Sequence, residues 1–251
     1  MLFGTVAACA GVALILTVGC TPGMDALRHP PVEVAASTSG IWSSMIYLTR
    51  VEGGIVAVDL GWVGSEGVLR EALASMGATP ADVRSVFLTH SHRDHIAGWR
   101  RVSHATFYLS APESALFVGA TEHRGPLTRL VEHLRRTRLP APGQLRIKTF
   151  SSDTQFVFGR DTVRAFPVAG HTAGSAAYLV RGHLFVGDAV TMLPFVGFGR
   201  ARWIYSDDVR QSTASVGALW KILAVDTTRV MCTAHGKCAP DSDALRAAAL
   251  H

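Results

Sequence analysis

The pattern of apolar and polar residues along the chain predicts short buried strands that alternate with helices. Ile41–Thr49 and Gly54–Leu60 are apolar runs rich in β-forming residues, and the turn between them, Glu52–Gly54, is typical of a hairpin. From Ser65 to Met76 the apolar positions follow a helical period, and Gly77 then provides a C-terminal stop. The first part of the chain is therefore expected to form a hairpin followed by a helix.

The same alternation continues to the C-terminus. Further strands are expected at 85–89, 105–109, 145–150, 155–159, 162–168, 175–181, 183–187 and 229–233. Helices are expected at 94–102, from 110, at 126–138, at 208–224 and after 241. Two strand-rich halves with helices outside indicate an α/β fold in which a two-layered sheet sandwich is covered by helices.

The first twenty residues form a separate segment. Met1–Cys20 contains no charged side chain and is long enough to cross the hydrocarbon core of a membrane as a helix. Leu16–Cys20 resembles a bacterial lipoprotein processing site, in which Cys20 would be lipidated; an uncleaved anchor helix and an ordinary cleaved signal are the alternatives. We expect residues 21–31 to be a tether and residues 32–251 to be one folded domain, anchored to a bacterial membrane or exported.

Composition supports one packed domain and narrows the choice of partners. Of the 251 residues, 48% are hydrophobic and 17% charged, so the chain is expected to fold around a core. The net charge of +5 comes without a dense basic tract, which permits an anionic substrate or a membrane surface and indicates no nucleic-acid partner. Cys232 and Cys238 flank His235, and they either form a disulfide in an oxidising compartment or remain two thiols.

The segment with the clearest chemistry is Thr89–His95 (THSHRDH), at the end of a predicted strand. Imidazole and carboxylate side chains together suit zinc or another divalent transition metal. In an extended loop, His90 and His92 project to the same side and can hold one ion. Asp94 and His95 enter the next helix and can face a second ion. A solvated histidine-rich turn is the alternative, which four potential ligands in this order argue against.

HxHxDH after a buried strand resembles the signature of the metallo-β-lactamase superfamily. Matching segments follow in order: Ala169–Ser175 is similar to the family's GHTxGS segment, Val186–Ala189 to its GDA segment, and Thr233–Gly236 to its late GHG-type segment. Asp59 matches an early strand-end aspartate that supports the site from beneath. The resemblance covers roughly residues 32–236 and implies an αββα four-layer sandwich.

Carried onto this chain, the resemblance implies a binuclear metal site. Three imidazoles would hold the first ion, two imidazoles and a carboxylate the second, and one further carboxylate would bridge them. In that order the residues are His90, His92 and His171; Asp94, His95 and His235; and Asp188. Two zinc ions are expected, with iron or manganese as alternatives. His123 and His133 are not expected to be ligands, because the set is already complete.

Such a site implies a metal-dependent hydrolase. Two neighbouring cations would lower the pKa of a shared water and provide a bridging hydroxide at neutral pH. That hydroxide would attack an electrophilic centre of the substrate, and Asp94 is expected to orient it and to help move its proton.

The segment Met192–Tyr205 offers the best indication of the substrate. It is apolar and aromatic, with interspersed glycines, and is expected to be a lid over an apolar acyl group of a small-molecule substrate. Arg200 or Arg202 would meet a negative charge, and Tyr205 would donate to a developing oxyanion. Alternatively, these aromatic residues pack against a helix or lie on the membrane surface.

An ester, lactone or thioester is the favoured target bond. True lactamases of this fold usually lack the aspartate matched by Asp188, and glutathione-specific hydrolases of the family carry a basic helical extension after the last ligand. Phosphodiesterase or β-lactamase-like activity is an alternative, as is a non-catalytic metal-binding accessory protein of the same fold.

Overall fold

The computed structural model describes residues 32–36, 44–62, 66–134, 139–193, 197–224, 227–236 and 238–251. The anchor and tether expected at residues 1–20 and 21–31 lie outside the described residues. Within the described ranges, no helix is both long enough and apolar enough to span a membrane.

Two six-stranded sheets and one separate hairpin make up the β-structure. The first sheet contains, in spatial order, β1 (Val32–Ala36), β2 (Met45–Val51), β3 (Gly54–Val58), β4 (Val83–Phe87), β5 (Thr106–Ser110) and β6 (Arg146–Phe150). The second contains β14 (Cys238–Pro240), β13 (Val230–Thr233), β10 (His183–Gly187), β9 (Ala176–Val180), β8 (Asp161–Pro167) and β7 (Thr154–Phe158). The hairpin pairs β11 (Val190–Leu193) with β12 (Gly197–Arg200).

Parallel pairing is concentrated where the site forms. β3, β4, β5 and β6 pair in parallel, and β10 pairs in parallel with β13. The remaining neighbours in both sheets are antiparallel. In a parallel arrangement, loops that leave adjacent strands emerge at the same edge, so residues far apart in sequence are brought together there.

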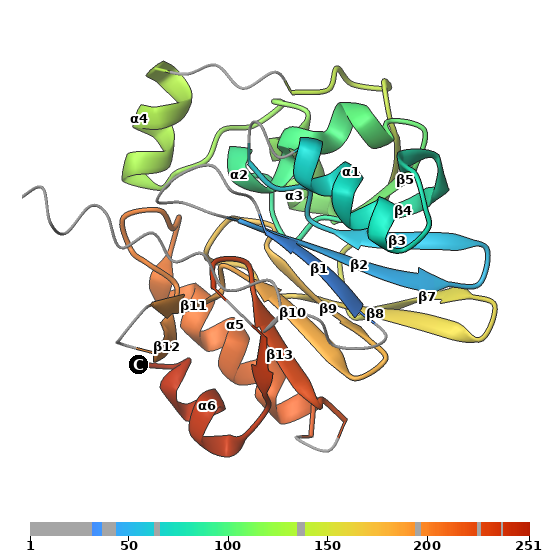
Figure 1. Ribbon diagram of the computed structural model, residues 1–251. Coiled ribbons are helices and arrows are strands. Elements are labelled where there is room, and N and C mark those ends of the chain that lie inside the picture. The colour runs from blue at the N-terminus through green and yellow to red at the C-terminus, as the bar shows by residue number, and fades with distance from the viewer. Residues whose placement is uncertain are drawn as a thin grey trace, which may run out of the picture.

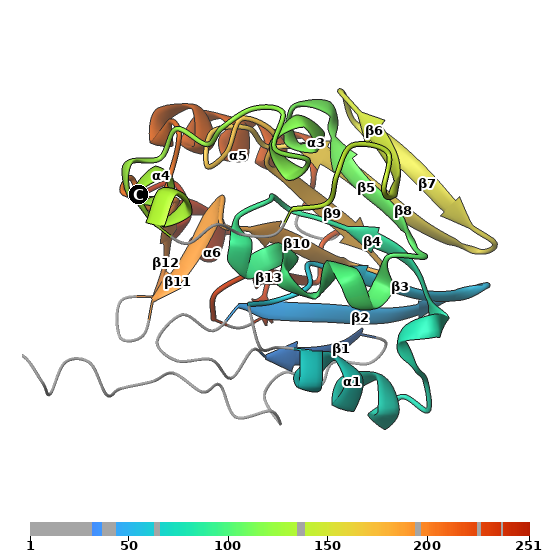
Figure 2. The same cartoon turned by 90° about the horizontal axis from the view of Figure 1, so that it is seen from above.

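The helices cover the outer faces of the sandwich. They are α1 (Glu66–Ser75), α2 (Arg93–Ile96), α3 (Ala111–Phe117), α4 (Pro126–Leu134), α5 (Val209–Ile222) and α6 (Asp243–Ala248). Figure 1 shows α1, α2 and α3 over the first sheet and α5 and α6 over the second. α4 and the β11–β12 hairpin lie on the same side of the molecule in both views (Figures 1 and 2).

Alternation along the strands explains the layers. In β3, Ile55 and Ala57 face the core beneath α1, whereas Val56 and Val58 face the core between the sheets. In β9, Tyr178 points between the sheets and Leu179 points toward α5. Because both faces of each sheet are covered, these strands are continuous apolar runs. The predicted α/β four-layer sandwich is confirmed.

The structure corrects several predicted elements. The helix expected at 94–102 is a single turn, α2, followed by a 3-10 helix over Ala97–Val102. Its backbone is engaged by the loop after β3, since Leu60 N donates to His95 O at 2.7 Å and Ala97 N donates to Gly61 O at 3.1 Å. β1, β14 and the β11–β12 hairpin were not predicted. β14 has only three residues, and β11 and β12 have four residues each. Residues 135–138 of the predicted fourth helix lie outside the described ranges.

Candidate metal centre

The predicted ligands gather at one edge of the sandwich. The segment from His90 to His95 leaves the end of β4, Asp188 follows β10, and His235 follows β13. His171 lies in the loop that connects β8 to β9. The structure therefore brings all the predicted ligands together from four separate stretches of chain.

Three ring nitrogens converge in the first half of this site. His171 Nε2 lies 3.2 Å from His90 Nε2 and 3.1 Å from His92 Nδ1. His171, His90 and His92 are 2%, 1% and 6% exposed. We call them the three-histidine half.

The outer nitrogens of the same rings reveal which atoms carry protons. Ser206 Oγ donates to Arg202 O at 2.7 Å, so it accepts from His171 Nδ1 at 3.0 Å. By the same logic Thr89 Oγ1, which donates to Asp59, accepts from His90 Nδ1 at 3.1 Å. Each neutral ring then has an unprotonated nitrogen pointing inward.

The third ring, that of His92, follows the same pattern with longer hydrogen-bond distances. Thr128 Oγ1 donates to Tyr205 O at 3.3 Å and lies 3.5 Å from His92 Nε2. A proton on His92 Nε2 leaves Nδ1 with its lone pair toward His171. Three lone pairs that face one another have no proton to share, and a cation between them resolves this arrangement.

The second half of the site combines carboxylates with imidazoles. His235 Nε2 lies 3.1 Å from Asp94 Oδ2 and 3.3 Å from Asp188 Oδ2. His95 Nε2 lies 3.6 Å from Asp94 Oδ2. We call Asp94, His95 and His235 the mixed half.

Asp188 lies between the two halves. Its Oδ2 atom is 3.8 Å from His171 Nε2 in the three-histidine half. The same atom is 3.9 Å from His95 Nε2 and 3.3 Å from His235 Nε2 in the mixed half. One carboxylate thus reaches ligand atoms of both groups, which is the position of a bridging ligand.

Asp59 supports the loop from beneath, as its place at the end of β3 suggested. Its carboxylate accepts from Thr89 N at 2.8 Å and from Thr89 Oγ1 at 2.7 Å, and it lies 2.9 Å from His95 Nδ1. This contact turns His95 Nε2 toward Asp94. Asp59 has a φ of +57°, a conformation that aspartate tolerates better than most residues.

The histidine pKa values differ between the two halves, because burial dominates in one half and neighbouring carboxylates dominate in the other. Burial, followed by the neighbouring imidazoles, holds the pKa of His90 and of His92 well below the usual value. Burial would also lower the pKa of His235, but Asp188 and Asp94 outweigh it and raise that pKa well above 6.5. Metal ions that bind the mixed half must therefore displace a proton.

The donor set fits a pair of divalent transition-metal ions. Imidazole nitrogens and carboxylate oxygens are ligands of zinc. Two nitrogens about 2.0 Å from a tetrahedral ion are roughly 3.3 Å apart, close to the separations of 3.2 and 3.1 Å within the three-histidine half. Ligation by these residues stays a prediction, and the geometry supports it.

One buried acid near the site was missed from the sequence. Glu113 is fully buried, and its carboxylate accepts from Ser91 and from Thr172. Burial raises its pKa to about 7 against the lowering effect of those hydrogen bonds. Glu113 lies three residues after Ser110, a position where glutamate is common in the first turn of a helix. The sequence therefore offers no reason to expect that its side chain points inward.

His123 lies behind the three-histidine half. Its ring centroid is 4.6 Å from that of His92, and burial lowers its pKa to about 4. It is outside the groups of converging ligand atoms found among the described residues. The side chain of His133 lies outside the described residues.

α4 and the segment 202–207 form one wall beside the site. Leu127 N donates to Ile204 O at 3.0 Å. The Asp207 carboxylate accepts from the backbone of Arg124, Gly125 and Ala173 at 2.6, 2.9 and 3.1 Å. Asp207 therefore joins the start of α4 to the loop that carries His171.

Cys232 and Cys238 form a disulfide, which settles the pairing left open by the sequence. The two residues are also register partners of β13 and β14. The disulfide closes the short loop that carries His235.

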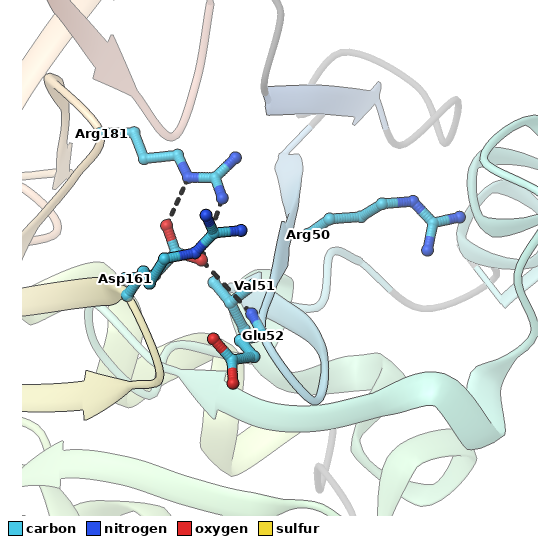
Figure 3. A pocket seen from close by; sticks show the side chains of 6 residues that line it. Arg50, Val51, Glu52, Asp161 and Arg181 are labelled. Carbon is cyan, nitrogen blue, oxygen red and sulfur yellow. Dashed lines mark hydrogen bonds and ion pairs between the residues drawn. The ribbon is translucent and has the colours of Figure 1, made fainter.

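A cavity of about 570 Å³ lies among hairpin turns and is lined by Arg50, Val51, Glu52, Arg160, Asp161 and Arg181 (Figure 3). The Arg181 side chain donates to both Asp161 oxygens, at 2.7 and 2.9 Å. Arg50 donates to the carbonyl of Met76. The lining has three arginines and two acids, and none of these residues belongs to the predicted metal site.

Comparison with known proteins identifies the family. The model of the Metallo-beta-lactamase superfamily matches residues 40–235, and the chain belongs to this superfamily, as its motifs predicted.

Two curated relatives are hydrolases by name. The chain is 25% identical over 158 residues to the probable polyketide biosynthesis zinc-dependent hydrolase BaeB of Bacillus velezensis, covering 60% of this chain and 56% of that protein. It is 27% identical over 171 residues to a hydroxyacylglutathione hydrolase of Shewanella sp. (strain ANA-3), covering 68% of this chain and 55% of that protein. The matched region thus spans little more than half of each relative.

Solved structures share the fold. A metallo-beta-lactamase family protein from Thermus thermophilus superposes with a TM-score of 0.62 at 22% identity, covering 88% of this chain and 77% of the other. A metallo-beta-lactamase from Pontibacter korlensis gives a TM-score of 0.63 at 18% identity, covering 89% of this chain and 94% of the other. At these identities the likeness concerns the fold alone.

Proposed function

We propose that this protein is a binuclear metal-dependent hydrolase that cleaves an ester, lactone or thioester bond in a small molecule with an apolar acyl group. The observation that carries this proposal is Asp188, whose Oδ2 atom lies within 4 Å of imidazole nitrogens in both halves of the site. The printed names of both curated relatives describe hydrolases, and one of them is called zinc-dependent.

When bound, two divalent cations supply a water activated for attack and a positive surface for the carbonyl oxygen. The protein contributes Asp94 as the acceptor of the proton from that water. Burial would raise the pKa of Asp94, but His95 and His235 outweigh burial and lower it, so the carboxylate is ionised at neutral pH. An ionised carboxylate beside the nucleophile orients it and takes its proton.

Exposure indicates the side from which substrate approaches. The side chains of His235, Asp94 and Asp188 are 26%, 15% and 13% exposed, whereas His171 is only 2% exposed. Substrate therefore reaches the mixed half first, and the three-histidine half stays covered.

The segment that follows the hairpin supplies the features that favour an acyl substrate. Trp203 is 70% exposed, and Leu130 on the adjoining α4 is 52% exposed. Burial raises the pKa of Tyr205, although Arg202 opposes this, so the phenol keeps its proton and can donate to a developing oxyanion. An apolar acyl group would lie against this wall, and Arg202 would meet any negative charge on the substrate.

The test is metal analysis of the full-length chain in detergent, combined with hydrolysis of matched lactone, ester, thioester, phosphodiester and β-lactam substrates. We expect about two zinc equivalents and turnover of an acyl substrate. Turnover of the phosphodiester or β-lactam alone, or two zinc ions without turnover, would contradict the proposal.

A pair of variants tests the role of Tyr205. Tyr205→Phe should lower kcat about 10-fold or more without changing zinc content, because Tyr205 lies outside the ligand set. The exposed residue Glu122 provides the control, and Glu122→Ala should leave both quantities unchanged. An unchanged kcat in Tyr205→Phe would remove the phenol from the reaction.

The N-terminal segment supports a membrane location, which we also propose. Met1–Cys20 is free of charged residues, and Cys20 occupies the position expected for lipidation. The full chain should sediment with bacterial membranes and release into the soluble fraction when residues 1–20 are replaced by a cleavable export signal. Equal recovery of both forms in the soluble fraction would refute attachment.

A further inference from the structure

Glu113 is a buried acid whose role the ligand set does not explain. It lies in the first turn of α3 and is 0% exposed. Carboxylates are rarely buried completely unless their oxygens are paired, because desolvation of the charged form is costly. Among the described residues, the hydrogen bonds of this carboxylate go to two loops of the metal site.

Each oxygen of the carboxylate engages a different loop. Oε1 accepts from Ser91 N and from Ser91 Oγ, both at 2.5 Å. Oε2 accepts from Thr172 Oγ1 at 2.5 Å. Ser91 stands between His90 and His92, and Thr172 follows His171 directly. The carboxylate thus spans the two backbone segments that carry all three residues of the three-histidine half.

The N-terminus of α3 is pressed against the second of these loops. Ser110 Oγ donates to Gly174 O at 2.5 Å. A Cβ atom at Gly174 would lie 2.2 Å from Glu113 N, so only glycine fits this approach. Thr172 is held in turn by Ser175, whose Oγ accepts from Thr172 N at 2.9 Å. Glu113 therefore contacts a loop that is also held by Ser110 and Ser175.

We propose that Glu113 is a positioning residue that sets the spacing of His90, His92 and His171 by holding the Ser91 and Thr172 loops together. Its contacts end one residue short of every ligand, so it does not touch the metal or the substrate. The inference rests on the metal centre of the proposed function and not on the choice of substrate.

Glu113 supports one half of the site, whereas Asp59 reaches both, because Thr89, which contacts His90, also donates to the Asp59 carboxylate. Asp59 contacts His95 directly, whereas the Glu113 carboxylate is hydrogen-bonded to neither Asp94 nor His235 within the described ranges. Loss of Glu113 should therefore weaken the ion of the three-histidine half selectively. Loss of a group that orients ligands typically lowers metal affinity about 10- to 100-fold.

Glutamine provides the matched conservative variant. Its amide oxygen can still accept from Ser91, and its amide nitrogen can donate to Thr172 Oγ1, which can redirect its own proton to Ser175 Oγ at 2.8 Å. Glu113→Gln should therefore keep most of the spacing, and Glu113→Ala should lose it.

The experiment measures zinc affinity by chelator competition on the full-length chain. In an Asp94→Ala background, which leaves the three-histidine half, Glu113→Ala should weaken zinc about 10- to 100-fold and Glu113→Gln by only a few fold. In a His92→Ala background, which leaves the mixed half, Glu113→Ala should change zinc affinity less than about 3-fold. Thr172→Val removes the hydrogen bond to Glu113, together with the contact to Ser175 Oγ, at nearly constant shape, and it covers the case in which Glu113→Ala does not fold.

Three outcomes overturn the positioning role. They are unchanged affinity in the Asp94→Ala background, equal weakening in both backgrounds, and a loss with Glu113→Gln as large as that with Glu113→Ala. If Glu113→Ala does not fold, unchanged affinity of Thr172→Val overturns it as well. Failure of the unsubstituted chain to bind two zinc ions would instead refute the proposed function, so the two failures are distinguishable.

Discussion

The two halves of the candidate metal centre differ in charge, exposure and support. In the three-histidine half, neutral rings are 1–6% exposed, and hydroxyl groups fix their outer nitrogens. In the mixed half, carboxylates and imidazoles pair with one another, and Asp94 and His235 are 15% and 26% exposed at the side chain. Under the proposed function, we therefore expect the three-histidine half to hold one ion firmly and the mixed half to be the side where the substrate reacts.

Removal of Asp188 should have the largest effect, because this carboxylate reaches both halves. Asp188→Ala should reduce zinc content below two equivalents and lower turnover by more than the roughly 100-fold that loss of a supporting group costs. Metal analysis and acyl-substrate hydrolysis on the same sample measure both effects. Two retained ions with full activity would remove Asp188 from the bridging position.

Asp94→Asn should impair the reaction at the mixed half and leave the three-histidine half intact. The amide cannot accept the proton of the attacking water, so kcat should fall about 100-fold or more. The ion of the three-histidine half should remain, because His90, His92 and His171 are unchanged. Steady-state kinetics and zinc content test this together, and a variant with near-normal kcat would contradict the role of Asp94.

The unfolding free energy of metal-free protein, measured over a pH series, should detect the ionisation of the buried Glu113 carboxylate beside the three-histidine half. The pKa of Glu113 is about 7 in the folded protein against an ordinary 4.5, so the native state binds more protons between these values. Its ionisation therefore destabilises the fold as the pH rises from about 4.5 to above 7. The unfolding free energy of Glu113→Gln relative to the unsubstituted chain should increase by about 3 kcal/mol across this window.

Chemical denaturation with a chelator present measures that difference, and the subtraction cancels the histidines that titrate in both proteins. A flat difference across the window would mean that the Glu113 pKa is not raised. Asp207, which also raises this pKa, offers a check, since Asp207→Asn should lower the upper end of the window and leave its lower end unchanged.

The smallest effect is expected at the far end of the sandwich. Asp161 pairs with Arg181, whose side chain is 38% exposed, and this partner lowers the pKa of Asp161 below 3.8. Its stabilising contribution is present above pH 3.8 and is lost as the pH falls through the lower, folded value. Asp161→Asn should cost less than about 1 kcal/mol at neutral pH and leave zinc affinity unchanged. A change in zinc affinity would show coupling between the two ends.

Four of the proposed ligands were predictable because they lie close together in the sequence, whereas His171, Asp188 and His235 were predicted from the resemblance of their motifs to the family. His90, His92, Asp94 and His95 fall within six residues at a strand end, and few other uses call for these side chains in that order. Asp59 was predicted from the resemblance of its motif. Central strands such as β9 and β10 were predictable because they are covered on two faces and are therefore apolar throughout.

The groups that hold the ligands were not predictable. Glu113, Ser206 and Thr128 are common residue types, and they lie 22, 35 and 36 residues from the partners they contact. The β11–β12 hairpin falls within the segment predicted to be a lid, and its strands escaped prediction because they are short and β12 contains two glycines.

By itself, the sequence determined the superfamily and the four-layer fold, because the family's motifs are short local segments that occur in order along the chain, and the same motifs predict the residues proposed to bind metal. Only the tertiary structure decided which nitrogen of each histidine points inward, that Glu113 turns toward the site and that Cys232 meets Cys238. Those outcomes depend on contacts between distant segments, and a hydroxyl or an acid becomes a support only when the fold places it within hydrogen-bond distance.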